Sequence, residues 1–137
     1  MRNGWLAAAA GVLLIGLPAA AHHSIAGIYD NRNPVRLEAV VVDFQFVNPH
    51  PFVVVETVDG SGRPQQWRLE MDNRFELSAV GMNAGTLKNG DRISVSGARA
   101  RDQSRALYVR RLDRAADGFW YEQVGSSPRT SRAPSPK

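Results

Sequence analysis

The stretch VRLEAVVVDFQFVNPHPFVVVETVDGSGRPQQWRLEM, residues 35–71, decides the fold because its pattern predicts three consecutive strands. Val35–Val47 is rich in β-branched and aromatic side chains, which are typical of strands. Asn48–Pro51 ends this first strand, since its two prolines cannot both lie inside a hydrogen-bonded ladder. Phe52–Val58 then resumes the same composition and predicts the second strand.

A hairpin turn and a third strand complete the stretch. Asp59–Gly62 contains the Asp and Gly residues that tight hairpin turns favour. Gln65–Met71 alternates, with Trp67, Leu69 and Met71 on one face and polar side chains on the other. That period of two predicts a strand with one buried face. We expect Met71, like Met82, to lie in the core rather than to bind Cu(I).

The period changes after the third strand. Asp72 or Asn73 can cap a short helix, which we expect near residues 73–81. Two more alternating strands are predicted at residues 92–98 and 106–112. The chain is therefore expected to be mainly β, a small five-stranded OB-like Greek-key barrel with one short helix between strands three and four. A β-sandwich or another small barrel is the alternative, because five strands and a helix do not dictate closure.

The first residues predict export. Arg2 precedes the uncharged apolar run Trp5–Leu17, and the small residues Ala19 and Ala21 suit a cleavage site after Ala21. An uncleaved membrane anchor is the alternative, but this run is shorter than the roughly 20 residues that cross a bilayer. We expect residues 1–21 to be a cleavable signal peptide. The mature chain would then work in a bacterial periplasm, without stable membrane insertion.

Composition divides the rest of the chain into one domain and a tail. Residues 22–125 contain as many basic as acidic side chains, so the net charge of +4 does not describe a basic face. Nucleic acid is therefore not an expected partner. Residues 126–137 are mostly Ser, Pro and basic residues, which predicts a disordered tail. The absence of cysteine excludes disulfides and thiolate chemistry.

Several local motifs occur together in this domain. They are His22-His23-Ser24-Ile25, Val47-Asn48-Pro49-His50, Trp67 in the third predicted strand, and Leu87-Lys88-Asn89-Gly90-Asp91 before the fourth. Over residues 22–112 the sequence resembles DUF6152, a family of small exported bacterial proteins of unknown function. The His-His-Ser opening and the Asn-Pro-His turn are its clearest marks, whereas Leu-Lys-x-Gly-Asp recurs before strands in many small barrels. The resemblance implies a periplasmic location and an OB-like barrel, and it implies no established activity.

The three histidines, His22, His23 and His50, are the candidate metal ligands. Cleavage after Ala21 makes His22 the first residue, so its α-amine and its imidazole can chelate a metal together. His50 or His23 can then supply a third nitrogen. A set of three nitrogens in a T shape suits Cu(II), which prefers nitrogen ligands in a square-planar or tetragonal field. The sequence therefore predicts a Cu(II) site at the mature N-terminus.

Two other interpretations of these histidines remain open. Cleavage after Ala20 would let the α-amine, two backbone amides and the His23 ring bind Cu(II) or Ni(II). Alternatively, the N-terminal histidines are exposed and idle, and His50 hydrogen-bonds a carbonyl to fix its proline-flanked loop.

The sequence contains no recognisable set of catalytic residues. Ser24 beside two histidines is not a triad, and the G-x-S-x-G motif of a nucleophile elbow is absent. We therefore expect a non-enzymatic protein that binds or handles Cu(II). The alternative is a metal-free OB-like module that binds an envelope protein or a small ligand. Phe119-Trp120-Tyr121 is expected to pack back against the barrel end, the alternative being an exposed contact patch.

Overall fold

The structure is a computed structural model that describes residues 25–125 and 127–132 of the chain. The predicted signal peptide at residues 1–21 lies outside this range, as do His22 and His23. The predictions that concern these residues therefore stay predictions.

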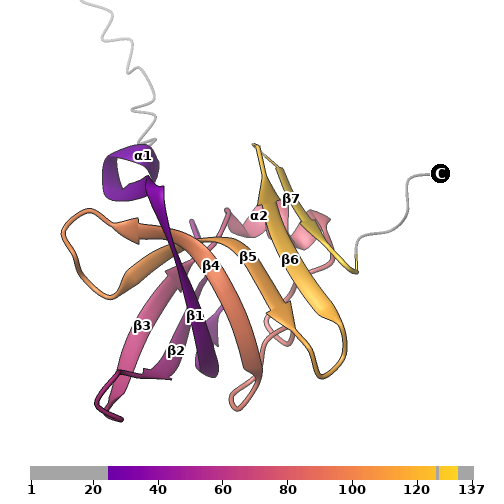
Figure 1. Ribbon diagram of the computed structural model, residues 1–137. Helices are drawn as coiled ribbons and strands as arrows, with labels where there is room; N and C mark the ends of the chain where they lie inside the picture. Colours follow the sequence, from indigo (N-terminus) through magenta and orange to yellow (C-terminus); the bar gives the residue numbers. More distant parts are fainter. Residues whose placement is uncertain (1–24, 126, 133–137) are drawn as a thin grey trace, which may run out of the picture.

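The described residues form a mainly β structure with two short helices (Figure 1). In chain order the elements are α1 (Ile25–Ile28), β1 (Tyr29–Gln45), β2 (Phe52–Val58), β3 (Pro64–Glu70), α2 (Arg74–Ala79), β4 (Arg92–Ala100), β5 (Ala106–Arg114), β6 (Phe119–Val124) and β7 (Ser127–Thr130). None of the helices within this part of the chain is long and apolar enough to cross a membrane.

The prediction of five strands was wrong, because the described residues form seven. Strands β2 to β5 lie close to where they were expected, β1 begins at Tyr29 instead of Val35, and β6 and β7 are additional. Strand β6 contains the aromatic segment, whose Phe119 and Tyr121 are buried and whose Trp120 is half-buried. The segment therefore packs back on the core, as expected, but does so as a strand paired with β5.

Strand β7 lies within residues 126–137, where a disordered tail was predicted. It pairs with β6, and the Thr130 hydroxyl donates a hydrogen bond of 2.6 Å to the Val80 carbonyl. Pro128 is tolerated because an edge strand can spare one backbone donor. The sequence Ser-Pro-Arg-Thr contains no alternation of apolar and polar residues, so this strand depends on its pairing with β6.

All seven strands belong to one sheet of order β3-β2-β1-β4-β5-β6-β7, and these neighbours pair antiparallel. In addition, β3 pairs in parallel with β5. The long strand β1 makes this possible because its first part pairs with β4 and its last part with β2. Figure 1 shows β1 running from α1 across the molecule. The pairings β1–β2–β3–β5–β4–β1 consequently form a continuous circuit.

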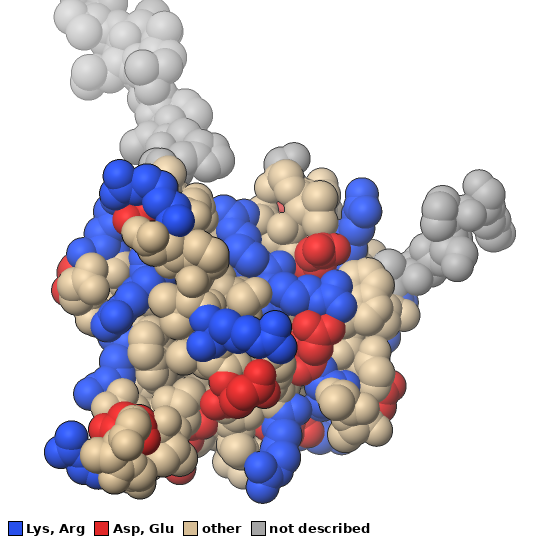
Figure 2. All heavy atoms as spheres, viewed as in Figure 1, with Lys and Arg blue, Asp and Glu red and all other residues tan. Residues whose placement is uncertain are grey.

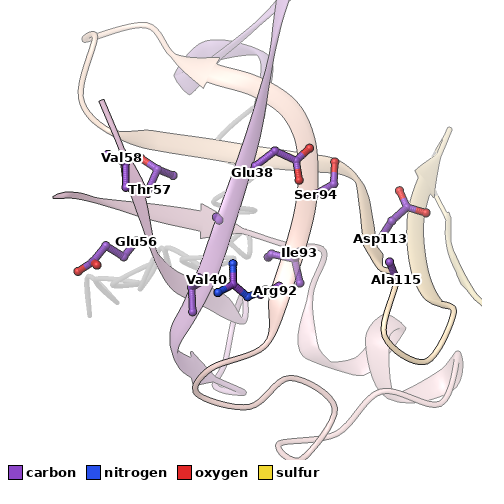
Figure 3. Close-up of a pocket in the computed structure, with 11 residues that line it drawn as sticks. Glu38, Val40, Glu56, Thr57, Val58, Arg92, Ile93, Ser94, Asp113 and Ala115 are labelled. Carbon is purple, nitrogen blue, oxygen red and sulfur yellow. The ribbon is translucent and has the colours of Figure 1, made fainter. Parts of the chain in front are cut away.

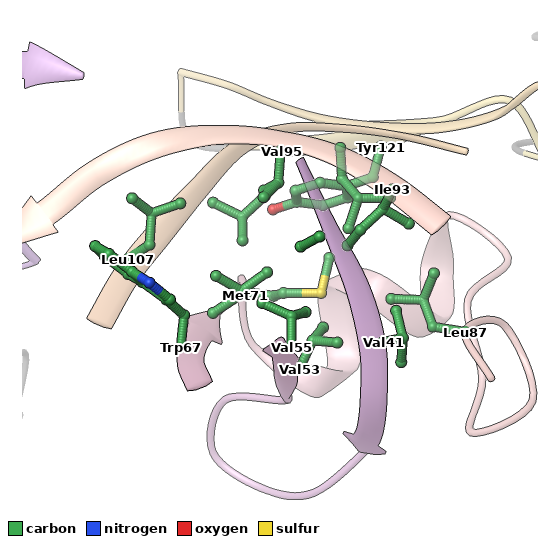
Figure 4. Close-up of a cluster of buried hydrophobic side chains, with 14 of the residues drawn as sticks. Val41, Val53, Val55, Trp67, Met71, Leu87, Ile93, Val95, Leu107 and Tyr121 are labelled. Atoms are coloured by element: carbon green, nitrogen blue, oxygen red, sulfur yellow. The ribbon is translucent and has the colours of Figure 1, made fainter. Parts of the chain in front are cut away.

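The core lies inside this circuit (Figure 4). Trp67, Leu69 and Met71 are all buried on one face of β3 and the residue after it, as the alternation predicted. Met71 is fully buried near the middle of the cluster, and Met82 is also buried, which confirms both as core residues. The strands that enclose them each contribute alternate apolar side chains.

A β-bulge lets β5 supply side chains to this core from both sides of its pleat. Gly97 pairs with Val109, whereas the neighbouring Ser96 pairs with Arg111, so Arg110 is the extra residue. Val109 and Leu112 are consequently both fully buried, although strict alternation would place them on opposite faces. The bulge brings the backbones close together: a Cβ at position 97 would lie 2.0 Å from the Tyr108 carbonyl oxygen.

Helix α2 follows β3 where the sequence predicted a short helix. The Asn73 side chain accepts a hydrogen bond of 2.9 Å from the Glu76 N–H, which makes Asn73 the N-cap. Leu77 is the one buried side chain of this helix, and Phe75 is 83% exposed. The cap places the first turn of α2 beside the loop between β1 and β2, which contains His50.

Candidate functional site

The loop between β1 and β2 is fastened to the chain on both sides of His50. The Met71 N–H donates to the Pro51 carbonyl at 3.0 Å, and the Arg74 N–H donates to the Pro49 carbonyl at 3.1 Å. Met71 directly follows β3, and Arg74 is the first residue of α2. His50 is therefore held beside the end of β3 by backbone contacts that do not depend on its own side chain.

The imidazole of His50 faces a carboxylate. Its Nδ1 lies 2.9 Å from Oε1 of Glu70, the last residue of β3. This distance is short enough for an ion pair, but the alignment of the two groups does not meet hydrogen-bond geometry. Nδ1 is buried, whereas the side chain as a whole is 31% exposed. The exposed surface of the side chain therefore lies away from Nδ1.

The other oxygen of Glu70 is bound by a buried tyrosine. The Tyr29 hydroxyl donates to Glu70 Oε2 at 2.6 Å, and Tyr29 is only 4% exposed. Burial raises the pKa of Tyr29 above its ordinary value, and the hydrogen bond to Glu70 and the charge of that residue add to the effect. Glu70 thus bridges the β1–β2 loop and the first residue of β1.

A second carboxylate two residues further along binds the other two tyrosines. Asp72 is buried, and its two oxygens accept hydrogen bonds of 2.6 Å each from the hydroxyls of Tyr108 and Tyr121. Burial raises the pKa of both phenols, and Asp72 raises it further. The Tyr29 and Tyr108 rings pack with centroids 5.7 Å apart. All three tyrosines of the chain therefore donate to Glu70 or Asp72, and we call these five residues the tyrosine–carboxylate cluster.

Strand pairing explains how residues so distant in sequence come together. Glu70 pairs with Tyr108 across the parallel contact of β3 and β5. Tyr29 and Tyr108 stand opposite Ala100 and Ala98 of β4, whose small side chains leave room for the two rings. The cluster is thus built at the point where β1, β3, β4 and β5 meet.

Comparison with known proteins places the chain in a family. The family model DUF6152, described as a family of unknown function, matches residues 8–108. The chain belongs to the DUF6152 family. No curated protein and no solved structure matches it. The region that matches DUF6152 includes His50, Glu70, Asp72 and Tyr108 but ends before β6, which contributes Tyr121.

Only one of the three predicted ligands of this DUF6152 protein lies in the described part of the chain. His50 is on the surface, and the structure gives it a carboxylate as neighbour instead of the carbonyl that the alternative interpretation expected. His22 and His23 lie outside that part. Within residues 25–125 and 127–132, no three His, Asp or Glu side chains are arranged to hold a metal ion. The described residues therefore offer one imidazole to a metal, with Glu70 behind it.

Sequence reasoning did not find Tyr29, Glu70 or Asp72 as members of a site. Each looks locally like an ordinary strand or turn residue, and the hydrogen bonds join residues 36 to 49 positions apart. The pairings of β3 with β5 and of β4 with β1 and β5 bring them together. The one available signal was the alternation of Glu70 and Asp72 with the buried Met71.

A separate groove of about 520 Å³ lies toward the other end of β2 (Figure 3). Its walls come from β1, β2, β4 and the end of β5, with Glu38, Glu56 and Asp113 as its carboxylates and Arg92 as its cation. Figure 2 shows basic and acidic side chains interspersed on the visible face of the molecule. This distribution agrees with the balanced charge of residues 22–125.

Proposed function

We propose that this protein is a non-enzymatic periplasmic protein that binds or handles Cu(II) through its mature N-terminus. The α-amine and imidazole of His22 would supply two nitrogens, and His50 the third, with His23 as the alternative donor. One observation supports this proposal above all: Nδ1 of His50 is buried beside Glu70, whereas the side chain as a whole is 31% exposed.

This orientation suits a metal ligand. An imidazole that binds a metal through one nitrogen usually presents the other to a carboxylate or carbonyl, which fixes the tautomer and makes the ligand more basic. Glu70 lies 2.9 Å from Nδ1, where a modest rotation of either group would align them for a hydrogen bond. Nε2 makes no hydrogen bond to the described residues, so a metal would not have to displace a protein partner from it.

The position of α1 favours a contribution from the mature N-terminus. Ile25 packs against the group that contains Tyr29, and the Tyr29 hydroxyl contacts the same carboxylate that faces His50. The three residues from Ile25 back to His22 span roughly 10 Å when extended. The proposal requires that this reach bring the amine and ring of His22 to Nε2 of His50.

We further propose that the circuit of strands β1–β2–β3–β5–β4 is an OB-like Greek-key barrel, with β6 and β7 added at one edge. Its pairings, including the parallel contact of β3 with β5, have the order of that fold. In OB-folds the loop between the first two strands contributes to the ligand face. That loop here contains His50.

A copper titration of the mature protein, residues 22–137, tests the site. We expect one Cu(II) to bind, and the His22→Ala and His50→Ala variants each to bind much more weakly. Binding should also weaken in acid, because a protonated imidazole cannot ligate. The precursor should bind poorly, since residue 22 then has a peptide nitrogen in place of an amine. Equal uptake by all three mature proteins, or uptake by none, would refute the proposal.

The exposed apolar residues near His50 favour a second candidate function. Phe75 on α2 is 83% exposed and Val47 is 41% exposed, and the Arg74–Pro49 hydrogen bond joins the segments that contain them. A metal-free module that binds an envelope protein would use such a surface. This alternative predicts no copper uptake, together with a specific crosslink to one envelope protein from a photoreactive residue at position 75.

A further inference from the structure

We propose that the corner where β1 and β2 separate is a docking site for an extended peptide segment of another protein, in which basic side chains alternate with apolar ones. The proposal does not depend on copper binding. It concerns the groove of about 520 Å³ in Figure 3, whose walls include β1 and the end of β2. The open backbone edge beside this groove and the carboxylates around it indicate what the groove would bind.

The ladder between β1 and β2 stops before either strand ends. Its last rung at this end joins Val40 to Glu56, and the next rung would join Glu38 to Val58. The two strands do not form that rung, because β2 continues beside β3 while the first part of β1 lies beside β4. All four of these residues line the groove. The groove therefore lies where the two strands diverge.

The backbone of β1 presents unpaired groups to this gap. The Val41 N–H donates to the Asp91 carbonyl, and the Val41 carbonyl accepts from the Gly90 N–H, both at 2.8 Å. Both groups of Val41 thus point toward β4, which begins directly after Asp91. Because the backbone groups of successive strand residues point to opposite edges, those of Arg36 and Glu38 point away from β4. Among the described residues, no strand pairs with them on that edge.

The charges on the outer side of the groove favour a basic side chain. Glu56 is exposed and forms no ion pair with a described residue, whereas Asp113 already pairs with Arg111 at 2.6 Å. Glu38 lies 3.6 Å from Arg36, but both side chains are 74% exposed, so water screens that pair. Glu56 is the diagonal neighbour of Glu38 across the two strands. A lysine or arginine on an added strand would therefore lie near two carboxylates, and opposite charges on neighbouring strands stabilise their pairing.

The inner side of the groove favours an apolar side chain. Leu37 is only partly buried where it packs against the core, and Thr57 is half-buried in the groove lining. An apolar side chain directed inward from an added strand would remove both from water. In strand addition, main-chain hydrogen bonds supply affinity and alternate side chains supply specificity. A second copy of this chain fits less well, since it would bring the same carboxylates, Glu38 and Glu56, to the groove.

Amide hydrogen exchange of the full-length protein tests the open edge without any substitution. We expect the amides of Arg36 and Glu38 to exchange roughly 10-fold or more faster than those of Leu37 and Ala39, which face β4. Equal protection of all four amides in the monomer would overturn the proposal. Protection of Arg36 and Glu38 that rises with protein concentration would show a second copy on this edge and would also overturn it.

A capped heptapeptide of alternating lysine and valine is the probe for the groove. We expect it to bind the full-length protein and to slow exchange at Arg36 and Glu38, and the same peptide with glutamate for lysine to bind much more weakly. The double variant Glu38→Gln, Glu56→Gln should bind the lysine peptide about 3–10-fold more weakly. The control, Glu76→Gln with Asp102→Asn, removes the same charge outside the groove and should match the wild type. Equal affinity for the two peptides, binding of neither, or an equal loss in the control would overturn the proposal.

A proline at position 36 separates the backbone contact from the charge. Arg36→Pro removes an N–H that faces the open edge and no hydrogen bond to β4, whereas Arg36→Ala loses the same charge and keeps that N–H. We expect Arg36→Ala to bind the lysine peptide at least as tightly as the wild type, and Arg36→Pro to lose binding. Equal binding by the two variants would overturn the proposal. The lysine peptide with N-methylated amides should fail to bind the wild type, and unchanged affinity would overturn the proposal even if Arg36→Pro does not fold.

Discussion

Single tyrosine residues stabilise the carboxylates that this protein removes from water, because their hydroxyls donate hydrogen bonds to them. A carboxylate removed from water loses its hydration and is costly unless hydrogen bonds replace it. Asp72 receives two such bonds from Tyr108 and Tyr121, and Glu70 receives one from Tyr29. The pKa of each phenol is raised as a result, because each would have to ionise beside a carboxylate in a buried position.

An alkaline titration tests this consequence. The pKa of all three phenols is raised above the ordinary value of 10.0. The folded state therefore keeps its phenol protons at pH values where the unfolded chain has released them, so the free energy of unfolding falls as pH rises above 10. We expect no tyrosinate absorbance until the protein unfolds. A tyrosine that titrates near pH 10 while the near-ultraviolet circular dichroism stays native would contradict the account.

Removal of one hydroxyl from the cluster tests the energetic value of these bonds. Tyr121→Phe leaves one oxygen of buried Asp72 without its partner, and we expect the free energy of unfolding to fall by about 1–3 kcal/mol. Thr57→Val is a suitable control, since it also removes a hydroxyl, but one whose contact with the Gln65 carbonyl is 3.5 Å. That control should change stability by less than about 0.5 kcal/mol in urea denaturation. Equal losses in the free energy of unfolding would show that the hydrogen bond from Tyr121 to Asp72 stabilises the fold no more than the Thr57 contact does.

At the scale of elements, the bulge in β5 depends on a close approach of two backbones. A Cβ at position 97 would lie 2.0 Å from the Tyr108 carbonyl oxygen, and backbone cannot move aside as a side chain can. Gly97→Ala should therefore lower the free energy of unfolding by about 1–3 kcal/mol. Gly60→Ala is the control, because a Cβ at position 60 meets nothing within 4 Å. If both variants have wild-type stability in urea denaturation, β4 and β5 do not approach each other at Gly97 as closely as described.

The individual strands and helices show which parts of the fold can be predicted from the sequence pattern. Strand β2 and helix α2 were found because each contains its own signal: a β-branched run in one and the Asn73 cap in the other. The start of β1 was missed, since residues 31–34 are polar or proline and the register with β4 shifts there. Strand β7 was not predicted because its residues form a strand only by pairing with β6. The tyrosine–carboxylate cluster was missed for a related reason, since its bonds join different strands.

At the scale of the whole molecule, the proposed copper site draws on two parts of the chain, the folded domain and the residues before it. The strand circuit belongs to the folded domain and the predicted ligands His22 and His23 precede it, whereas the DUF6152 match over residues 8–108 covers both. His50 was identifiable from sequence as one of only three histidines, and the structure adds Glu70 and Tyr29 behind it. The N-terminal half of the proposed site would depend on processing, which no strand pattern can reveal.

The most direct test of the central claim is the intact mass of the secreted protein, measured under native conditions with and without Cu(II). The account predicts the mass of residues 22–137 alone, and that mass plus one copper ion after Cu(II) is added. The His50→Ala protein should have the same N-terminus and lose the copper adduct. A secreted chain that retains residues 1–21, or a mature chain that takes up no copper, would contradict the claim that the processed N-terminus and His50 form a copper site.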